Sequence, residues 1–184
     1  TVKSKGGKVD GVLRFSIMWA ENNGDDSDLD AHCEQPDRRT IYYSSPRSTM
    51  GSLDVDIRQP SKQMPNGAVE NITFPVLSNM RDGEYKFMVH QFSARNSRGF
   101  KAEIEFNGEA YNYEINTAVT DYTNVATVTL KNGQFSIKHY LPNKTASSKK
   151  LWNLDTNQFH KVNLVSLSPN FWGDNNIGNK HYMF

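Results

Sequence analysis

The sequence has little cysteine, no long apolar run and almost no excess charge. Its single cysteine, Cys33, cannot form an internal disulfide bond, which is compatible with a reducing compartment. No apolar run approaches the roughly 18–20 residues that span a bilayer, and residues 1–10 contain no hydrophobic signal core. We therefore predict a soluble, cytoplasmic protein without a membrane partner, although secretion and association with a virion stay open.

The balance of charges argues against a polyanionic partner. The chain of 184 residues carries 21 Lys and Arg against 20 Asp and Glu, which gives a formal net charge of +1. Proteins that bind nucleic acid present a clear excess of positive charge on at least one surface. We therefore expect no nucleic-acid partner.

Helical periodicity is also scarce, because apolar residues recur at every second position instead. Leu13, Phe15 and Ile17 share one face of an extended segment in this pattern. Asn107-Gly108 and Asn132-Gly133 are pairs typical of two-residue type I′ hairpins. Many short strands separated by turns predict an all-β fold, a two-sheet antiparallel β-sandwich of jelly-roll or Greek-key type, with a C-terminal extension.

Composition divides the chain into four parts. We expect a flexible N-terminal arm over residues 1–10 and the β-sandwich over residues 11–142. The polar, basic stretch 143–150 predicts a linker. Residues 151–184 are a C-terminal extension that would begin a further module, so we expect a larger protein to surround this chain.

Two acidic segments point to a metal site. In an extended strand, Asp28 and Asp30 face the same way about 6–7 Å apart, and Asp54 and Asp56 do the same. If the two strands are neighbours, the four carboxylates share one patch and repel each other unless a cation neutralises them. Calcium prefers such an all-oxygen shell, and Glu70 is a candidate fifth ligand.

Further polar and aromatic residues extend the candidate site. His32 continues the face of Asp28 and Asp30, so the three residues could instead bind a transition metal, although no other histidine is spaced to join them. Tyr42 and Tyr43 are candidate binding residues, because tyrosines can form an aromatic platform for sugars or bases. The alternative for both tyrosines is ordinary packing on a sheet.

Several motifs resemble those of known domains. The strands Asp28-Leu-Asp-Ala-His32, Gly51-Ser-Leu-Asp-Val-Asp56 and Glu70-Asn-Ile72 resemble those of a group of uncharacterised bacterial and phage β-sandwich domains. This group is related to the TerD-type tellurite-resistance domains, in which an Asp-x-Asp strand helps to build a calcium site. The resemblance implies a sandwich fold and a metal site that includes Asp28 and Asp30. It does not indicate whether the protein has an activity.

Three functions follow from these observations. The leading hypothesis is a non-catalytic, calcium-binding β-sandwich that acts as a binding or interaction module of a larger bacterial or phage protein, with a protein or glycan partner. The first alternative is a structural or assembly module without metal, which would self-associate into a homo-oligomer. The second alternative is a metal-dependent hydrolase that uses Asp28, Asp30 and His32.

Overall fold

The computed structural model describes residues 11–21, 24–54, 67–147, 150–151, 154–155, 166–167 and 182–183. The chain divides into two compact units, Thr1–Lys149 and Lys150–Phe184. In the second unit, the described residues form two antiparallel pairs of two-residue strands, β12 (Lys150–Leu151) with β13 (Leu154–Asp155) and β14 (Ser166–Leu167) with β15 (Tyr182–Met183). The predicted N-terminal arm, residues 1–10, lies outside the described residues.

The described part of the first unit consists of strands β1 to β11 and one short 3-10 helix, η2. Their bounds are β1 (Leu13–Trp19), β2 (Asp28–Glu34), β3 (Thr40–Ile41), β4 (Ser52–Leu53), β5 (Ala68–Phe74), η2 (Leu77–Asn79), β6 (Gly83–Ser93), β7 (Phe100–Phe106), β8 (Glu109–Ile115), β9 (Tyr122–Lys131), β10 (Gln134–His139) and β11 (Asn143–Ser147).

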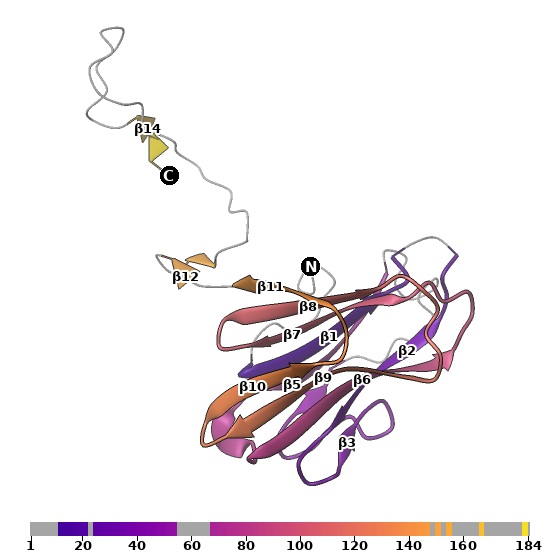
Figure 1. Ribbon diagram of the computed structural model, residues 1–184, viewed down its shortest axis with the longest axis horizontal. Coiled ribbons are helices and arrows are strands. Elements are labelled where there is room, and N and C mark those ends of the chain that lie inside the picture. Colours follow the sequence, from indigo (N-terminus) through magenta and orange to yellow (C-terminus); the bar gives the residue numbers. More distant parts are fainter. Residues whose placement is uncertain are drawn as a thin grey trace, which may run out of the picture. The chain divides into compact units, whose positions relative to one another are not determined.

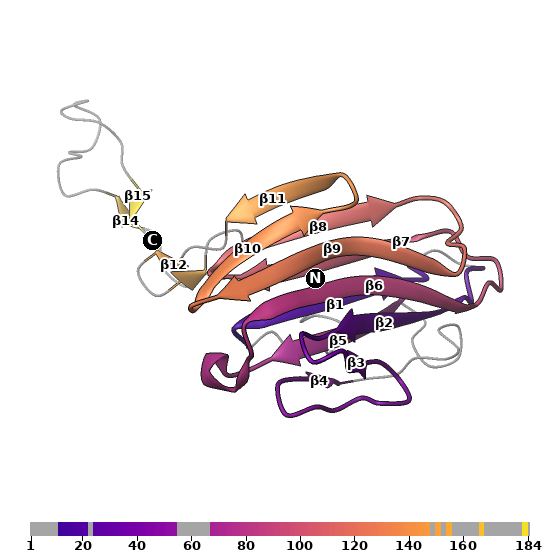
Figure 2. The same cartoon turned by 60° about the horizontal axis from the view of Figure 1, so that its bottom comes forward.

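These strands form two antiparallel sheets packed face to face (Figure 1). The six-stranded sheet has the order β11-β8-β7-β1-β5-β4, and the five-stranded sheet has the order β10-β9-β6-β2-β3. Figure 2 shows β9, β6, β2 and β3 following one another across the five-stranded sheet. The predicted all-β, two-sheet antiparallel sandwich is therefore confirmed.

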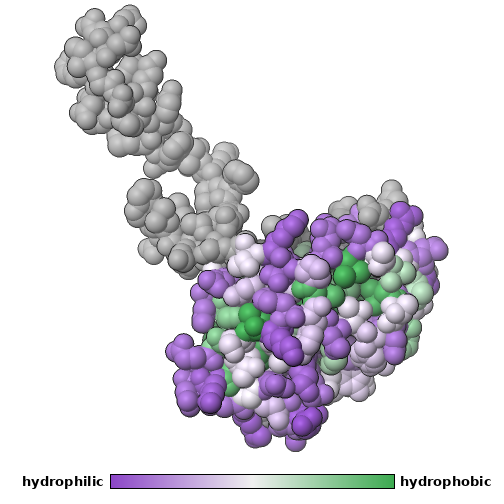
Figure 3. All heavy atoms as spheres, viewed as in Figure 1, coloured by the Kyte–Doolittle hydropathy of each residue, from purple (hydrophilic) through white to green (hydrophobic). Residues whose placement is uncertain are grey.

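The core lies between the sheets and is built by the alternation seen in the sequence. Every second residue of β1, from Leu13 to Trp19, is buried, and Leu29, Ala31 and Cys33 of β2 face the same interior. The hydrophobic residues of the viewed face lie in patches bordered by hydrophilic ones (Figure 3). Because the inner positions of β2 are apolar, its remaining side chains must point to the outer face of the five-stranded sheet.

Both predicted hairpins are present. Asn107 and Gly108 have φ angles of 52° and 74°, and Asn132 and Gly133 have φ angles of 51° and 75°. Two successive positive φ angles are what a type I′ turn requires, and asparagine and glycine tolerate them best. These turns join β7 to β8 and β9 to β10 with Phe106 opposite Glu109 and Lys131 opposite Gln134.

The segment predicted as a linker differs in the structure. Residues 143–147 form β11, which pairs with β8 at the edge of the six-stranded sheet, from Asn143 opposite Tyr113 to Ser147 opposite Glu109. An edge strand is held by backbone hydrogen bonds on one side only and needs few apolar side chains. A polar composition therefore does not distinguish an edge strand from a linker.

Candidate functional site

Three side chains that can bind a metal meet on the outer face of the five-stranded sheet. Asp30 and His32 come from β2, where they alternate with the buried Leu29 and Ala31. His90 comes from the neighbouring strand β6 and lies directly opposite Asp30 in the pairing register. The sheet therefore brings together two residues of one strand and the cross-strand partner of one of them.

Asp30, His32 and His90 are named here the metal-ligand group. Each offers one ligand atom, and these atoms lie within 4.8 Å of one another. The Oδ2 atom of Asp30 is 3.2 Å from Nδ1 of His90. Asp30 and His32 are buried, with 3% and 5% of their surface exposed, whereas the His90 side chain is 20% exposed. The group is thus reached from solvent on the side of His90.

His32 is held as a neutral imidazole. Burial, and secondarily the neighbouring His90, lower the pKa of His32 to about 4. Its Nε2 atom is buried and finds no hydrogen-bond partner within the described part of the chain. A buried polar atom without a partner costs free energy, and a neutral imidazole can bind a metal through its unprotonated ring nitrogen.

His90 is surrounded by acidic and aromatic groups. Besides Asp30, the carboxylate of Asp121 approaches its ring, with Oδ1 3.8 Å from Nε2. Tyr122 of β9 stacks on the imidazole with ring centroids 4.4 Å apart and an interplanar angle of 28°. These contacts fix the ring of His90 beside Asp30.

Four aromatic side chains, Tyr42, Tyr43, Phe92 and Tyr122, form what we call the aromatic rim. Tyr42 contacts Tyr43 at 5.2 Å between ring centroids, and Tyr43 contacts Phe92 at 5.9 Å. The imidazoles close the circle, because His90 contacts Phe92 and Tyr122, and His32 contacts Tyr122 and Tyr42. The metal-ligand group therefore lies among aromatic rings. Two of these rings, Tyr42 and Tyr43, were predicted from the sequence as binding residues.

The described parts of the two acidic segments do not lie on neighbouring strands. Asp28 and Asp30 belong to β2 in the five-stranded sheet, whereas Asp54 follows β4 in the six-stranded sheet. Asp54 accepts a hydrogen bond of 3.2 Å from Nδ2 of Asn71. The condition that the two strands be neighbours was therefore wrong, since alternation assigns residues to faces but does not say which sheet a strand joins. Asp56 lies outside the described residues.

Asp28 has a cationic neighbour. Its Oδ2 atom is 3.5 Å from the guanidinium of Arg95. The side chain is buried, with 8% of its surface exposed, so the nearby positive charge acts through a medium that screens it weakly. Arg95 thus compensates the negative charge of Asp28, a role that the sequence prediction gave to a bound cation.

Glu70, a predicted metal ligand, does not lie on the sheet face that carries the metal-ligand group. It faces the sandwich interior with its β5 neighbours Ala68 and Ile72, and it is fully buried. Its Oε2 atom accepts a hydrogen bond of 2.9 Å from the backbone N–H of Ala31. The carboxylate therefore supports β2 at Ala31, from the inner side of the sheet.

We expect Glu70→Ala to destabilise the fold by about 1–3 kcal/mol, because the buried Ala31 N–H would lose its acceptor. Glu70→Gln keeps an acceptor oxygen of the same reach and should cost less. Urea unfolding of both variants measures the difference. Equal losses in the two variants would show that the hydrogen bond to Ala31 contributes little.

The low pKa of His32 predicts a loss of stability in acid. Between about pH 6.5 and 4 the unfolded chain binds a proton at this residue and the folded chain does not, so stability falls as the pH falls. In EDTA, moving from pH 7.5 to 4.5 should cost the wild type about 2 kcal/mol more than His32→Gln. Chemical denaturation at both pH values tests this, and identical losses would show that His32 titrates normally.

The donor set favours some metals over others. Two imidazole nitrogens and one carboxylate suit zinc and the neighbouring transition metals, whereas calcium prefers oxygen ligands only. Sequence reasoning missed His90, although its alternation with the buried Tyr85, Phe87 and Val89 placed it on the outer face. The pairing of β6 with β2, which joins residues 60 positions apart, was needed to find it.

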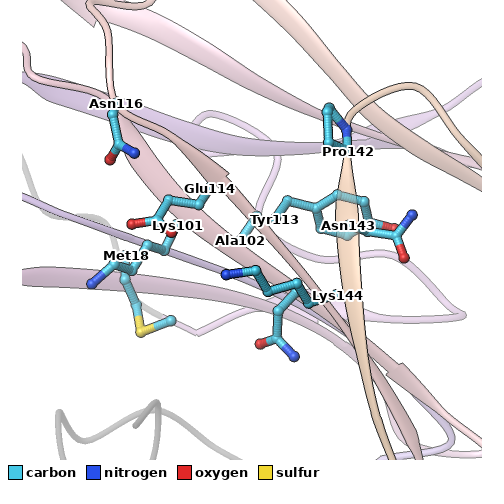
Figure 4. A pocket seen from close by; sticks show the side chains of 10 residues that line it. Met18, Lys101, Ala102, Tyr113, Glu114, Asn116, Pro142, Asn143 and Lys144 are labelled. Atoms are coloured by element: carbon cyan, nitrogen blue, oxygen red, sulfur yellow. The ribbon is translucent and has the colours of Figure 1, made fainter.

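A separate cavity of about 310 Å³ is lined by residues of β1, β7, β8 and β11 in the six-stranded sheet. Lys101, one of its lining residues, is engaged by Glu21 at 2.6 Å, and the pKa of Lys101 is raised, mainly by this hydrogen bond. The cavity therefore combines two lysines, one of them paired with Glu21, with a glutamate, amides and apolar groups, and this mixture indicates no particular chemistry. Its lining residues are Met18, Lys101, Ala102, Asn112, Tyr113, Glu114, Asn116, Pro142, Asn143 and Lys144 (Figure 4).

Comparison with known proteins gives no family. No protein-family model matches the chain, and no curated protein sequence matches it. The resemblance to TerD-type domains therefore stays a prediction. Among the described residues, no helix is both long and apolar enough to cross a membrane.

Proposed function

We propose that this β-sandwich binds a divalent transition metal of the zinc class through Asp30, His32 and His90. The observation that carries the proposal is the convergence of the three ligand atoms within 4.8 Å of one another on one sheet face. The buried Nε2 atom of His32, which finds no hydrogen bond among the described groups, supports it independently. A metal bond would satisfy this atom and relieve the cost of its burial.

The geometry requires a modest adjustment on binding. Zinc lies about 2.0–2.2 Å from nitrogen and oxygen ligands, so tetrahedral ligand atoms are roughly 3.4 Å apart. The Asp30 and His90 atoms, at 3.2 Å, already satisfy this spacing. A separation of up to 4.8 Å would have to shorten by up to about 1.4 Å, which side-chain rotation can supply while the paired strands β2 and β6 keep their backbone positions.

We propose a binding role for the metal, as part of an interaction module. Three protein ligands leave at least one coordination position open, and the aromatic rim beside it offers contact area for a partner. Calcium bound by Asp28 and Asp30 is the alternative, but it would place the ion next to the Arg95 guanidinium. The same open position would serve a hydrolase, which predicts turnover of a substrate in addition to binding.

Titration of the metal-free protein tests the proposal. Isothermal titration with zinc should give saturable binding of one ion, and zinc should raise the melting temperature, because a ligand bound only by the folded state stabilises it. Calcium at the same concentration should leave the melting temperature unchanged. Stabilisation by calcium but not by zinc would contradict the proposed donor set and support the calcium site predicted from the sequence.

A further inference from the structure

The aromatic rim is exposed although it surrounds a buried group of metal ligands. Phe92 is 61% exposed, Tyr122 is 50% exposed and Tyr43 is 37% exposed. These three rings meet Tyr42 and the two imidazoles in a closed circle of ring contacts. Large aromatic side chains gathered in solvent around a polar centre are typical of a ligand-binding surface.

We infer that this surface binds a neutral saccharide, an inference that depends on the metal site proposed above. A sugar ring has apolar C–H faces and a polar edge of hydroxyl groups, so it can use both features of the surface at once. The C–H faces stack on the rings of the aromatic rim. Neighbouring hydroxyls would ligate a metal held by Asp30, His32 and His90 and would form hydrogen bonds with tyrosine hydroxyls.

The charges around the aromatic rim match an uncharged ligand. Asp121 is a highly exposed carboxylate beside the rim, with 82% of its side chain accessible. The nearby cation, Arg95, faces the carboxylate of Asp28. A polyanion would be repelled by Asp121 and would have to compete with Asp28 for Arg95. A neutral polyol is not repelled by Asp121 and does not compete with Asp28 for Arg95.

The size of the rim also favours a small ligand over a folded protein. A stable protein interface buries roughly 800 Å² on each partner. Here the exposed apolar groups are the side chains of Tyr43, Phe92 and Tyr122, and the acidic Asp121 lies beside them. Three rings on a sheet face suit the length of a few sugar units.

Affinity electrophoresis tests the inference with defined probes. The protein is run in zinc or in EDTA through gels that contain soluble β-glucan, mannan, xylan, galactan or arabinan, with polygalacturonate and heparin as anionic probes. We expect at least one neutral polysaccharide to retard the protein in zinc and not in EDTA. Phe92→Ala and Tyr43→Ala should each weaken this binding about tenfold. Tyr43→Ala should leave the zinc affinity unchanged by calorimetry, because the ring of Tyr43 contacts Tyr42 and Phe92.

Tyr140→Ala is the matched control, because Tyr140 is 49% exposed but does not belong to the aromatic rim. It should bind the polysaccharide like the wild type. Failure of every neutral probe, binding that survives EDTA, retardation by the anionic probes only, or equal losses in Tyr140→Ala and Phe92→Ala would each overturn the inference. If zinc binding persists in calorimetry, such a failure leaves the proposed metal function intact, whereas absence of zinc binding removes both.

Discussion

The Asp30→Asn, His90→Gln double variant is expected to lose zinc binding, with an affinity at least a hundredfold below that of the wild type. The variant replaces the carboxylate of Asp30 and the imidazole of His90, whose Oδ2 and Nδ1 atoms are 3.2 Å apart. At a zinc concentration one hundred times the wild-type dissociation constant, the wild type should gain about 2.7 kcal/mol of stability. The variant should gain almost none, as measured by thermal unfolding with and without zinc.

His139→Gln is the control for this variant. His139 lies on β10 of the same sheet and its Nδ1 atom is 2.8 Å from the hydroxyl of Tyr113, but it does not belong to the metal-ligand group. This variant should keep the full response to zinc. Loss of zinc binding in His139→Gln, or its retention in the double variant, would place the metal elsewhere on the chain.

Gly99→Ala is expected to destabilise the sandwich by about 3 kcal/mol or more. Gly99 precedes β7 with a φ angle of +107°, which L side chains rarely adopt, and an added Cβ atom would clash with the backbone oxygen of Ile115. The clash is with backbone at the end of β8, so relief would require separating the ends of the β7 and β8 strands, where Phe100 pairs with Ile115.

Gly133→Ala separates the two contributions to this effect. Gly133 also has a positive φ angle, +75°, but an added Cβ atom would meet no atom within 4 Å. Its cost should therefore be the conformational one alone, about 1–2 kcal/mol. Urea unfolding of both variants measures the difference, and equal midpoints would show that the contact with Ile115 is relieved without cost.

Much of the fold could be predicted from residue patterns because sandwiches depend on them directly. The alternation of β1 and β2 and the Asn-Gly pairs at 107–108 and 132–133 specify faces and turns through local chemistry. Residues 143–147 could not be recognised as β11, because an edge strand is held by its neighbour's backbone and leaves no apolar pattern.

The candidate site was only half visible in the sequence for a related reason. Asp30 and His32 are two positions apart on one strand, so local alternation places them together. His90 joins them through the pairing of β2 with β6, and Asp54 is separated from them by the assignment of β4 to the other sheet. Both facts are properties of strand order, which depends on contacts distant in sequence. Calcium was predicted because the sequence pattern indicated the carboxylate ligands but not the second imidazole, that of His90.

A crystal structure of the zinc-soaked protein, with anomalous data on both sides of the zinc absorption edge, tests the central claim most directly. The account predicts one strong anomalous peak about 2.0–2.2 Å from a carboxylate oxygen of Asp30 and from one ring nitrogen each of His32 and His90. A peak at other residues, or no peak at this face while the three side chains are ordered, would contradict it.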